Sequence, residues 1–297
     1  MKNKFVRNAL VFFAIFTMTI TGAMADTLEK AKTTGKFTLA YRESSIPFSY
    51  LGEDGKPLGF GWEMCKLIAE EVKKQTGRKD LVVESQAVTS QNRIPLIQNG
   101  TVDVECGSTT NNSERGKQVT FAINYFYTGT RFLVKADSGI KSINDLKGKK
   151  VVSTTGTTNY QILRNLNDEK KYGFELLGAK DHADALLMVE SGMANAFGMD
   201  DILLYGLKAS SKESAKLAVV GESIQVEPYA IMFRKDDPKF QALVNKVITT
   251  SMKSGEFEKA YKKWFQTNIP PKNVNLNAPM SKELKDNLKA LSDKPAL

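Results

Sequence analysis

The feature that most constrains the fold is a regular alternation of strand-like and helix-like segments. In the first part of the chain this alternation takes the order strand, helix, strand, short helix, strand, at Phe37–Tyr41, Glu63–Lys74, Leu81–Glu84, a segment from Ser90 onward, and Val102–Glu105. Such an order is typical of a parallel sheet with helices on both faces. The pattern therefore predicts an α/β fold.

A second run of the same alternation follows. Strand patterns at 150–155, 174–177 and 194–199 are separated by amphipathic helical patterns that begin after Gly156 and at Asp181. This run is long enough to form an α/β unit of its own.

Two extended segments separate the second unit from the first, at 121–134, where Gly129 interrupts the pattern, and at 229–235. Helical patterns at 236–253 and 256–265 follow the second segment, and we expect them to return to the first unit. The sequence thus predicts a hinged pair of lobes. Their expected limits are 26–128 plus 231–297 for lobe 1, and 129–230 for lobe 2.

Polar loops follow several of the predicted strands. They contain Arg42, Ser90 to Arg93, Ser108 to Arg115, Thr155 to Thr158, and Asp200. Ligands of open α/β sheets bind outside the carboxyl ends of the strands. The same residues are also typical of ordinary polar turns and a surface arginine, but their convergence at one edge favours a site for an anion such as a carboxylate.

The N-terminus has the composition of a secretory signal peptide. Three basic residues precede an apolar run, Ala9–Ile20, and Ala23-Met24-Ala25 is a typical cleavage sequence. We therefore expect residues 1–25 to be removed and the mature protein to be soluble and periplasmic. The formal net charge of +9 becomes +6 without the three basic residues of the leader, and the remaining charge is scattered.

The two cysteines, Cys65 and Cys106, could form one disulfide in an oxidising compartment. Cys65 falls in a predicted helix and Cys106 at the end of a predicted strand, both among apolar residues. The pattern slightly favours two buried free thiols over a disulfide.

Several longer motifs identify a family resemblance. Arg-Glu-Ser-Ser-Ile-Pro-Phe-Ser-Tyr at 42–50, Thr-Ser-Gln-Asn-Arg-Ile-Pro-Leu at 89–96, Glu-Cys-Gly-Ser-Thr-Thr-Asn-Asn at 105–112 and Ala-Lys-Asp-His at 179–182 resemble the periplasmic glutamate/aspartate-binding proteins of ABC importers, in solute-binding protein family 3. The resemblance covers essentially the whole mature chain. It implies a two-lobed type II periplasmic-binding-protein fold with two hinge crossings.

The resemblance also implies roles for residues that match the family motifs. Arg115 would pair with the α-carboxylate of an amino acid, helped by the hydroxyls of Ser108, Thr110 and Thr158. Asp200 would bind the α-ammonium group. These residues would form the part of the site that every amino acid shares.

A second cationic region would distinguish an acidic ligand from a neutral one. The resemblance places Arg42, Arg93 and His182 there, with Ser90 assisting. Two hydroxyls either contribute to the site or only hold its turn: Thr155 and Thr157.

The resemblance implies a non-catalytic protein whose partners are L-glutamate or L-aspartate and a membrane permease. We expect a monomer without a cofactor, a metal or a nucleic-acid partner. An exported dehydratase or hydrolase on the same scaffold is the main alternative, with Glu43 or Asp181 as its acid or base. That alternative has little support, because the sequence has no G-x-S-x-G, H-E-x-x-H or C-x-x-C motif. A sensory or adhesive surface protein is a third interpretation.

Overall fold

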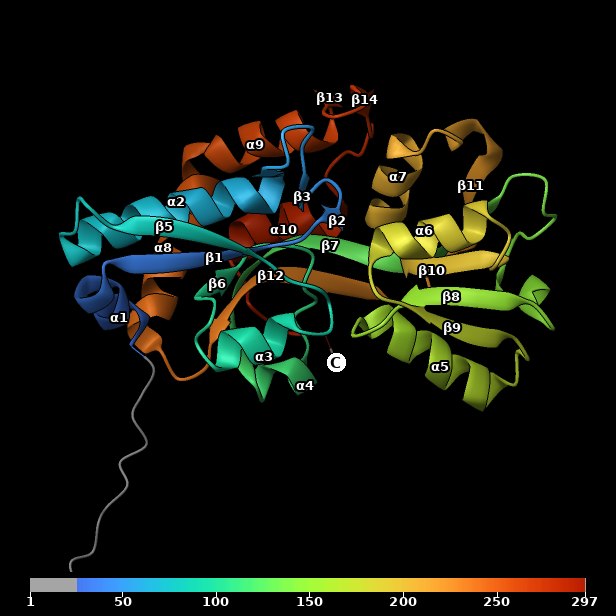
Figure 1. Cartoon of the computed structure of the whole chain (residues 1–297), viewed down its shortest axis with the longest axis horizontal. Coiled ribbons are helices and arrows are strands. Elements are labelled where there is room, and N and C mark those ends of the chain that lie inside the picture. The colour runs from blue at the N-terminus through green and yellow to red at the C-terminus, as the bar shows by residue number, and fades with distance from the viewer. Residues whose placement is uncertain (1–25, 297) are drawn as a thin grey trace, which may run out of the picture.

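The protein was analysed as a computed structural model that describes residues 26–296. The predicted leader, residues 1–25, lies outside the described residues. Figure 1 shows two groups of strands and helices side by side, with one long strand running from the first group into the second. Within residues 26–296, no helix combines the length and the apolar character needed to cross a membrane.

Three parallel strands begin the sheet of the first group: β5 (Val82–Ala87), β1 (Lys36–Tyr41) and β6 (Val104–Glu105). Helices from the N-terminal part of the chain surround them, namely α1 (Thr27–Thr34), α2 (Phe60–Thr76), α3 (Arg93–Gln98) and α4 (Ser113–Gly116). Gly77 ends α2 in the left-handed conformation, with φ of 69°.

The strand β6 is shorter and more deeply buried than its alternating pattern indicates. Asp103 and Glu105 would face solvent in a half-buried strand, yet both are buried. Asp103 accepts hydrogen bonds from the Thr38 backbone N–H at 2.9 Å and from Lys30 Nζ at 2.8 Å. These contacts allow a carboxylate to be buried where periodicity alone predicts exposure.

The second group also contains a parallel sheet, with β8 (Lys150–Thr154) between β9 (Glu175–Ala179) and β10 (Ala196–Asp200). Its helices are α5 (Thr158–Lys170), α6 (His182–Glu190) and α7 (Asp201–Ser210). The group is completed by the 3-10 turns η1 (Ile143–Leu146) and η2 (Ser214–Lys216) and by β11 (Leu217–Val220), a strand that the sequence pattern did not reveal.

Two strands connect the groups. The first is β7 (Val119–Lys135), whose N-terminal part pairs antiparallel with β12 (Val226–Arg234) and whose C-terminal part pairs with β10 and β11. The partner of β7 changes between Gly129, opposite Val226, and Thr130, opposite Asp200. The resulting strand order is β5-β1-β6-β12-β7-β10-β8-β9, with β11 beside β7.

Gly129 does not interrupt β7, contrary to the sequence pattern. A Cβ at this position would lie 1.7 Å from Ser223 Oγ, so the glycine permits a close approach between chain segments. The strand therefore passes through the region between the groups without a break.

The C-terminal helices return to the first group, as predicted. They are α8 (Pro238–Ser254) and α9 (Glu256–Phe265), with Gly255 between them at φ of 82°. The ring of Phe60 in α2 lies 5.2 Å from that of Phe257 and 5.3 Å from that of Phe265. The chain then forms the short pair β13 (Asn268–Ile269) and β14 (Val274–Asn275), followed by α10 (Lys282–Ala290), which packs on β7.

The structure overturns the preference for free thiols, because Cys65 and Cys106 form a disulfide. Their Cα atoms are 5.7 Å apart, within the range that a disulfide requires. Helix α2 packs over the end of β6, and this tertiary contact brings the two sulfur atoms together. Apolar surroundings in the sequence could not indicate that distance.

The segment after β1 is more ordered than the predicted loop. It contains a three-stranded antiparallel sheet formed by β2 (Ser44–Ser45), β3 (Ser49–Leu51) and β4 (Pro57–Leu58). This small sheet lies beside the second group and fixes the position of Arg42, whose backbone N–H donates to Ser49 Oγ at 2.9 Å.

Candidate functional site

Polar loops from both groups meet at the carboxyl ends of the strands. Residues after β5 and β6 face residues after β8 and β9 and residues at the end of β10, around a cavity of about 10 Å³, which is roughly the space that one water molecule needs. Seven of the ten residues selected from the sequence line this cavity: Ser90, Arg93, Ser108, Thr110, Thr158, His182 and Asp200.

The remaining three selected residues lie around this cavity in different ways. Arg42 contacts Ser90 and His182, and Arg115 contacts the backbone of both groups. Thr155 instead donates from its hydroxyl to the Ala179 backbone oxygen at 3.1 Å. That contact fits the turn-holding role that the sequence left open for Thr155.

Two buried arginines dominate the electrostatics of the site. Arg42 Nη2 donates to Ser90 Oγ at 2.9 Å, and Arg93 Nη1 donates to the Ser108 backbone oxygen at 3.4 Å. Arg42 Nε and Nη1 and Arg93 Nε find no hydrogen-bond partner within residues 26–296. Burial, followed by the charges of Arg115 and Arg42, lowers the pKa of Arg93 well below its usual value. These guanidinium groups are therefore arranged to bind an anion.

His182 is the first residue of α6 and lies between the two groups. Its Nδ1 is 2.8 Å from Thr154 Oγ1, and its Nε2 is 3.4 Å from Arg42 Nη2. Burial and the Arg42 charge lower the pKa of His182 to about 3, although Asp181 opposes this shift. The imidazole is therefore neutral at pH 7, and an anion bound beside it would raise its pKa.

Arg115 joins the two groups through backbone carbonyls. Its Nη1 donates to the Thr110 oxygen at 3.0 Å, and its Nη2 donates to the Gly156 oxygen at 3.2 Å. The helix α4 that carries Arg115 begins with a cap from Asn112, whose side chain accepts the Arg115 backbone N–H. The cap fixes the direction in which the guanidinium leaves the helix.

Asp200 provides a buried acid opposite the arginines. Its Oδ1 accepts from Asn159 Nδ2 at 2.8 Å, and its Oδ2 accepts from the Tyr229 hydroxyl. Burial and the neighbouring Glu227 raise the pKa of Asp200 to about 7. A cation bound beside this acid would favour its ionised form.

Sequence reasoning missed several residues of this site. These are Asn159, Met199 and Leu203, which line the cavity. Thr157, for which the sequence left two roles open, also lines it, and its hydroxyl caps α5 by accepting the Tyr160 backbone N–H at 3.1 Å. Glu227 was also missed. The sequence offers one sign of its importance, an acid within an otherwise apolar and aromatic strand. Its burial could not be predicted, because that burial depends on contacts with both groups.

The short helix expected from Ser90 onward begins later in the structure. Ser90 does not cap the short helix α3, which begins after Asn92. The Ser90 side chain is instead used by Arg42. The Ser90 hydroxyl thus takes part in a tertiary contact with the buried Arg42 and not in a local contact at the start of the helix.

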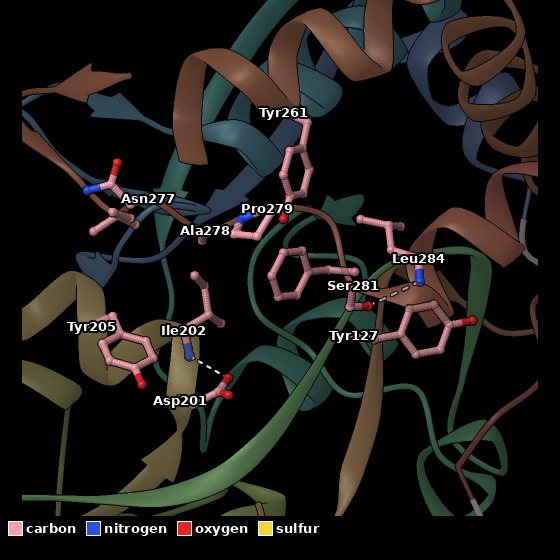
Figure 2. A pocket seen from close by; sticks show the side chains of 12 residues that line it. Tyr127, Asp201, Ile202, Tyr205, Tyr261, Asn277, Ala278, Pro279, Ser281 and Leu284 are labelled. Carbon is pink, nitrogen blue, oxygen red and sulfur yellow. Dashed lines mark hydrogen bonds between the residues drawn. The ribbon is translucent and has the colours of Figure 1, made fainter. Parts of the chain in front are cut away.

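A larger cavity, of about 360 Å³, lies elsewhere between the groups. Figure 2 shows Ile202 and Tyr205 of α7 on one side of it, with Tyr261 of α9 and the segment 277–279 on the other. Among the described residues that line it, Asp201 is the only charged one. The smaller cavity has the cations and the acid needed to recognise a charged ligand, so it is the better candidate site.

Comparison with known proteins connects this site to a family. Residues 37–267 match the family model of bacterial extracellular solute-binding proteins, family 3. The chain is 48% identical to the L-glutamate/L-aspartate-binding protein of Pseudomonas aeruginosa, over 97% of this chain and 96% of that protein. It is 46% identical to the glutamate/aspartate import solute-binding protein of Escherichia coli, over 92% of this chain and 90% of that protein.

A solved structure supports the same relationship. A mutant of ArgBP from T. maritima superimposes with a TM-score of 0.71 and 25% identity, over 81% of this chain and 99% of that one. The fold is thus the two-lobed type II periplasmic-binding-protein fold that the sequence motifs implied. The similar proteins are binding proteins by name, so the enzyme hypothesis is not retained. The chain belongs to the bacterial extracellular solute-binding proteins of family 3.

Proposed function

We propose that this protein captures L-glutamate or L-aspartate between its two lobes and delivers it to the permease of an ABC importer. The observation that carries this proposal is the pair of buried arginines, Arg42 and Arg93, which have N–H groups without a partner in residues 26–296. His182 lies close to this pair, with its Nε2 3.4 Å from Arg42 Nη2. The names of the two relatives from Pseudomonas aeruginosa and Escherichia coli support the same ligands.

In the proposed complex the two ends of the ligand meet different residues. The α-carboxylate would bind Arg115 with the hydroxyls of Ser108, Thr110 and Thr158, near the N-terminus of α5, whose free N–H groups favour an anion. The α-ammonium would bind Asp200.

The side-chain carboxylate would bind Arg42 and Arg93, with Ser90 and His182 beside them. Thr155 contributes indirectly in this proposal, through its contact with the Ala179 backbone. The nearest acid to Arg42 is Asp181, whose Oδ2 lies 3.8 Å from Arg42 Nη2. A neutral ligand side chain would therefore leave most of the positive charge of the two buried guanidinium groups uncompensated, which costs several kcal/mol. We therefore expect glutamine and asparagine to bind far more weakly than the acidic amino acids.

The lobe limits are proposed as residues 26–128 plus 231–297 for lobe 1 and 129–230 for lobe 2. The change of partner along β7 at Gly129 and Thr130 supports the first boundary. A cavity of about 10 Å³ is smaller than a dicarboxylic amino acid, so the lobes would separate to admit the ligand and close around it.

The cellular setting is part of the proposal. The leader pattern at residues 1–25 supports export and removal of this segment, and the family description supports a place outside the cytoplasm. We propose that the protein acts in the periplasm as a monomer, with a permease as its macromolecular partner and without a nucleic-acid partner.

Calorimetry on protein freed of bound ligand by unfolding and refolding tests the proposal. We expect L-glutamate and L-aspartate to bind and glutamine to bind at least 100-fold more weakly. The variant Arg93→Met should lose this binding, whereas Arg164→Met, at an exposed arginine of α5, should retain it. Equal affinity for glutamate and glutamine would contradict the proposal.

A further inference from the structure

Glu227 is a buried carboxylate in contact with both lobes. It lies near the start of β12, and its Oε2 accepts hydrogen bonds from Thr158 Oγ1 at 2.6 Å and from Thr110 Oγ1 at 3.1 Å. The two threonine oxygens are themselves 3.2 Å apart. One carboxylate oxygen thus draws together a hydroxyl that follows β6 and a hydroxyl at the start of α5.

Arg115 places a positive charge near the same carboxylate. Burial raises the pKa of Glu227, and the Arg115 charge and the two threonine hydroxyls oppose that increase. In turn, Glu227 is the principal acid that opposes the lowering of the Arg115 pKa by burial. Glu227 therefore interacts with Thr110, Thr158 and Arg115, three of the groups that the proposed function gives to the ligand α-carboxylate.

The hydroxyls of Thr110 and Thr158 cannot donate to Glu227 and to a ligand carboxylate at the same time. A threonine hydroxyl has one proton to donate. In the structure, both Thr110 and Thr158 direct that proton toward Glu227. A ligand carboxylate at the same hydroxyls would need those protons and would also place a second negative charge near Glu227.

We propose that Glu227 is an internal competitor of the ligand, a carboxylate of the protein that uses the α-carboxylate site when the ligand is absent. It would hold the site together in the unliganded protein and lower the affinity for the ligand. This inference rests on the proposed function, because it concerns the same hydroxyls and the same arginine. Glu227 is thus a residue that tunes affinity, in contrast to Asp200, which would bind the ligand directly.

The variant Glu227→Gln tests the inference, since it removes the charge with little change in shape. Calorimetry should give a dissociation constant for L-glutamate that is lower by roughly tenfold or more, as expected from removal of one competing charge-assisted contact. Glu222→Gln, at an exposed acid outside the site, is the matched control and should leave the dissociation constant unchanged.

The direction of the change decides between two roles. Weaker binding by Glu227→Gln would overturn the inference and make Glu227 a partner of the α-ammonium group, and unchanged binding would overturn it as well. Thermal unfolding of each variant checks the fold. Glu227→Asp, which keeps the charge but withdraws it by one methylene group, provides a second variant with an expected smaller gain in affinity.

The controls also separate this inference from the proposed function. If the unmodified protein binds neither L-glutamate nor L-aspartate, the proposed function fails. If the unmodified protein binds and Glu227→Gln does not bind more tightly, only the role of Glu227 fails.

Discussion

Arg42 Nη2 and His182 Nε2 lie 3.4 Å apart, although the two residues are 140 positions apart in the sequence and belong to different groups of strands. Arg42 follows β1 of the first group, and His182 begins α6 of the second. Both side chains are buried, and the arginine charge helps to keep the histidine neutral. This contact makes the electrostatics of the site dependent on how closely the lobes approach.

Replacing Arg42 by methionine should separate folding from function. The buried guanidinium has two N–H positions without a partner in the described chain, but its Nη2 also lies 3.8 Å from Asp181 Oδ2. These effects oppose each other, so Arg42→Met should change the free energy of unfolding of the unliganded protein by no more than about 1 kcal/mol. Denaturant unfolding measures this change. Binding of L-glutamate should fall by a factor of about 100 or more in calorimetry. A large loss of stability without ligand would contradict the first expectation.

Lowering the pH should destabilise the protein through His182. The unfolded histidine titrates near pH 6.5 and the folded one near pH 3, so the unfolded state takes up the proton first as the pH falls. The contribution of neutral His182 to stability is therefore present above about pH 6.5 and decreases as the pH falls from there toward 3.

The variant His182→Gln should remove this part of the pH dependence. Because the sequence contains one histidine, the difference in free energy of unfolding between the unmodified protein and this variant, followed against pH, isolates the contribution of that histidine. We expect that difference to change by about 2 kcal/mol between pH 7 and pH 4.5. Denaturant unfolding at several pH values measures it, and parallel curves for the two proteins would disprove the prediction.

Substitution of Gly156 should block closure. A Cβ there would lie 2.6 Å from Gln91 Cα and 2.7 Å from Gln91 N, which belong to the turn that faces α5 from the first group. Gly156→Ala should therefore weaken L-glutamate binding by about tenfold or more, because backbone atoms cannot move aside easily. Calorimetry measures the effect.

Gly148→Ala is the matched control for this experiment. Gly148 also has a positive φ, of 70°, but a Cβ there would meet no atom within 4 Å. Both variants should lose about 1 kcal/mol of stability from backbone strain. Only Gly156→Ala should lose affinity, and equal affinities for the two variants would show that closure tolerates the added carbon.

Removing the disulfide should affect both stability and binding. The bond joins residues 41 positions apart, and the chain-entropy relation gives a stabilisation of about 4 kcal/mol for a loop of this size. The double variant Cys65→Ser with Cys106→Ser should therefore unfold at lower denaturant concentration. It should also bind L-glutamate more weakly, since Cys106 precedes the turn that contains Ser108 and Thr110. Unchanged affinity would show that packing alone holds this turn.

Much of the fold is local enough to be predicted from the sequence. Helix α2 ends at Gly77 because a glycine readily adopts the left-handed conformation found there. The turn η1 begins at Ser142, whose side chain and that of Asp145 form a capping box. Such signals involve residues a few positions apart, and this is why the order of elements could be predicted while β11 and the small sheet after β1 could not.

The sequence by itself determined the α/β alternation, the two extended crossings and, through its motifs, most residues of the candidate site. The tertiary structure decided which of these residues meet: it joined Cys65 to Cys106, directed Ser90 to Arg42, and buried Glu227 against Thr110 and Thr158. Periodicity reports the faces of single helices and strands, whereas these contacts depend on how separate elements pack. A partner that is distant in the sequence therefore becomes visible only in the folded chain.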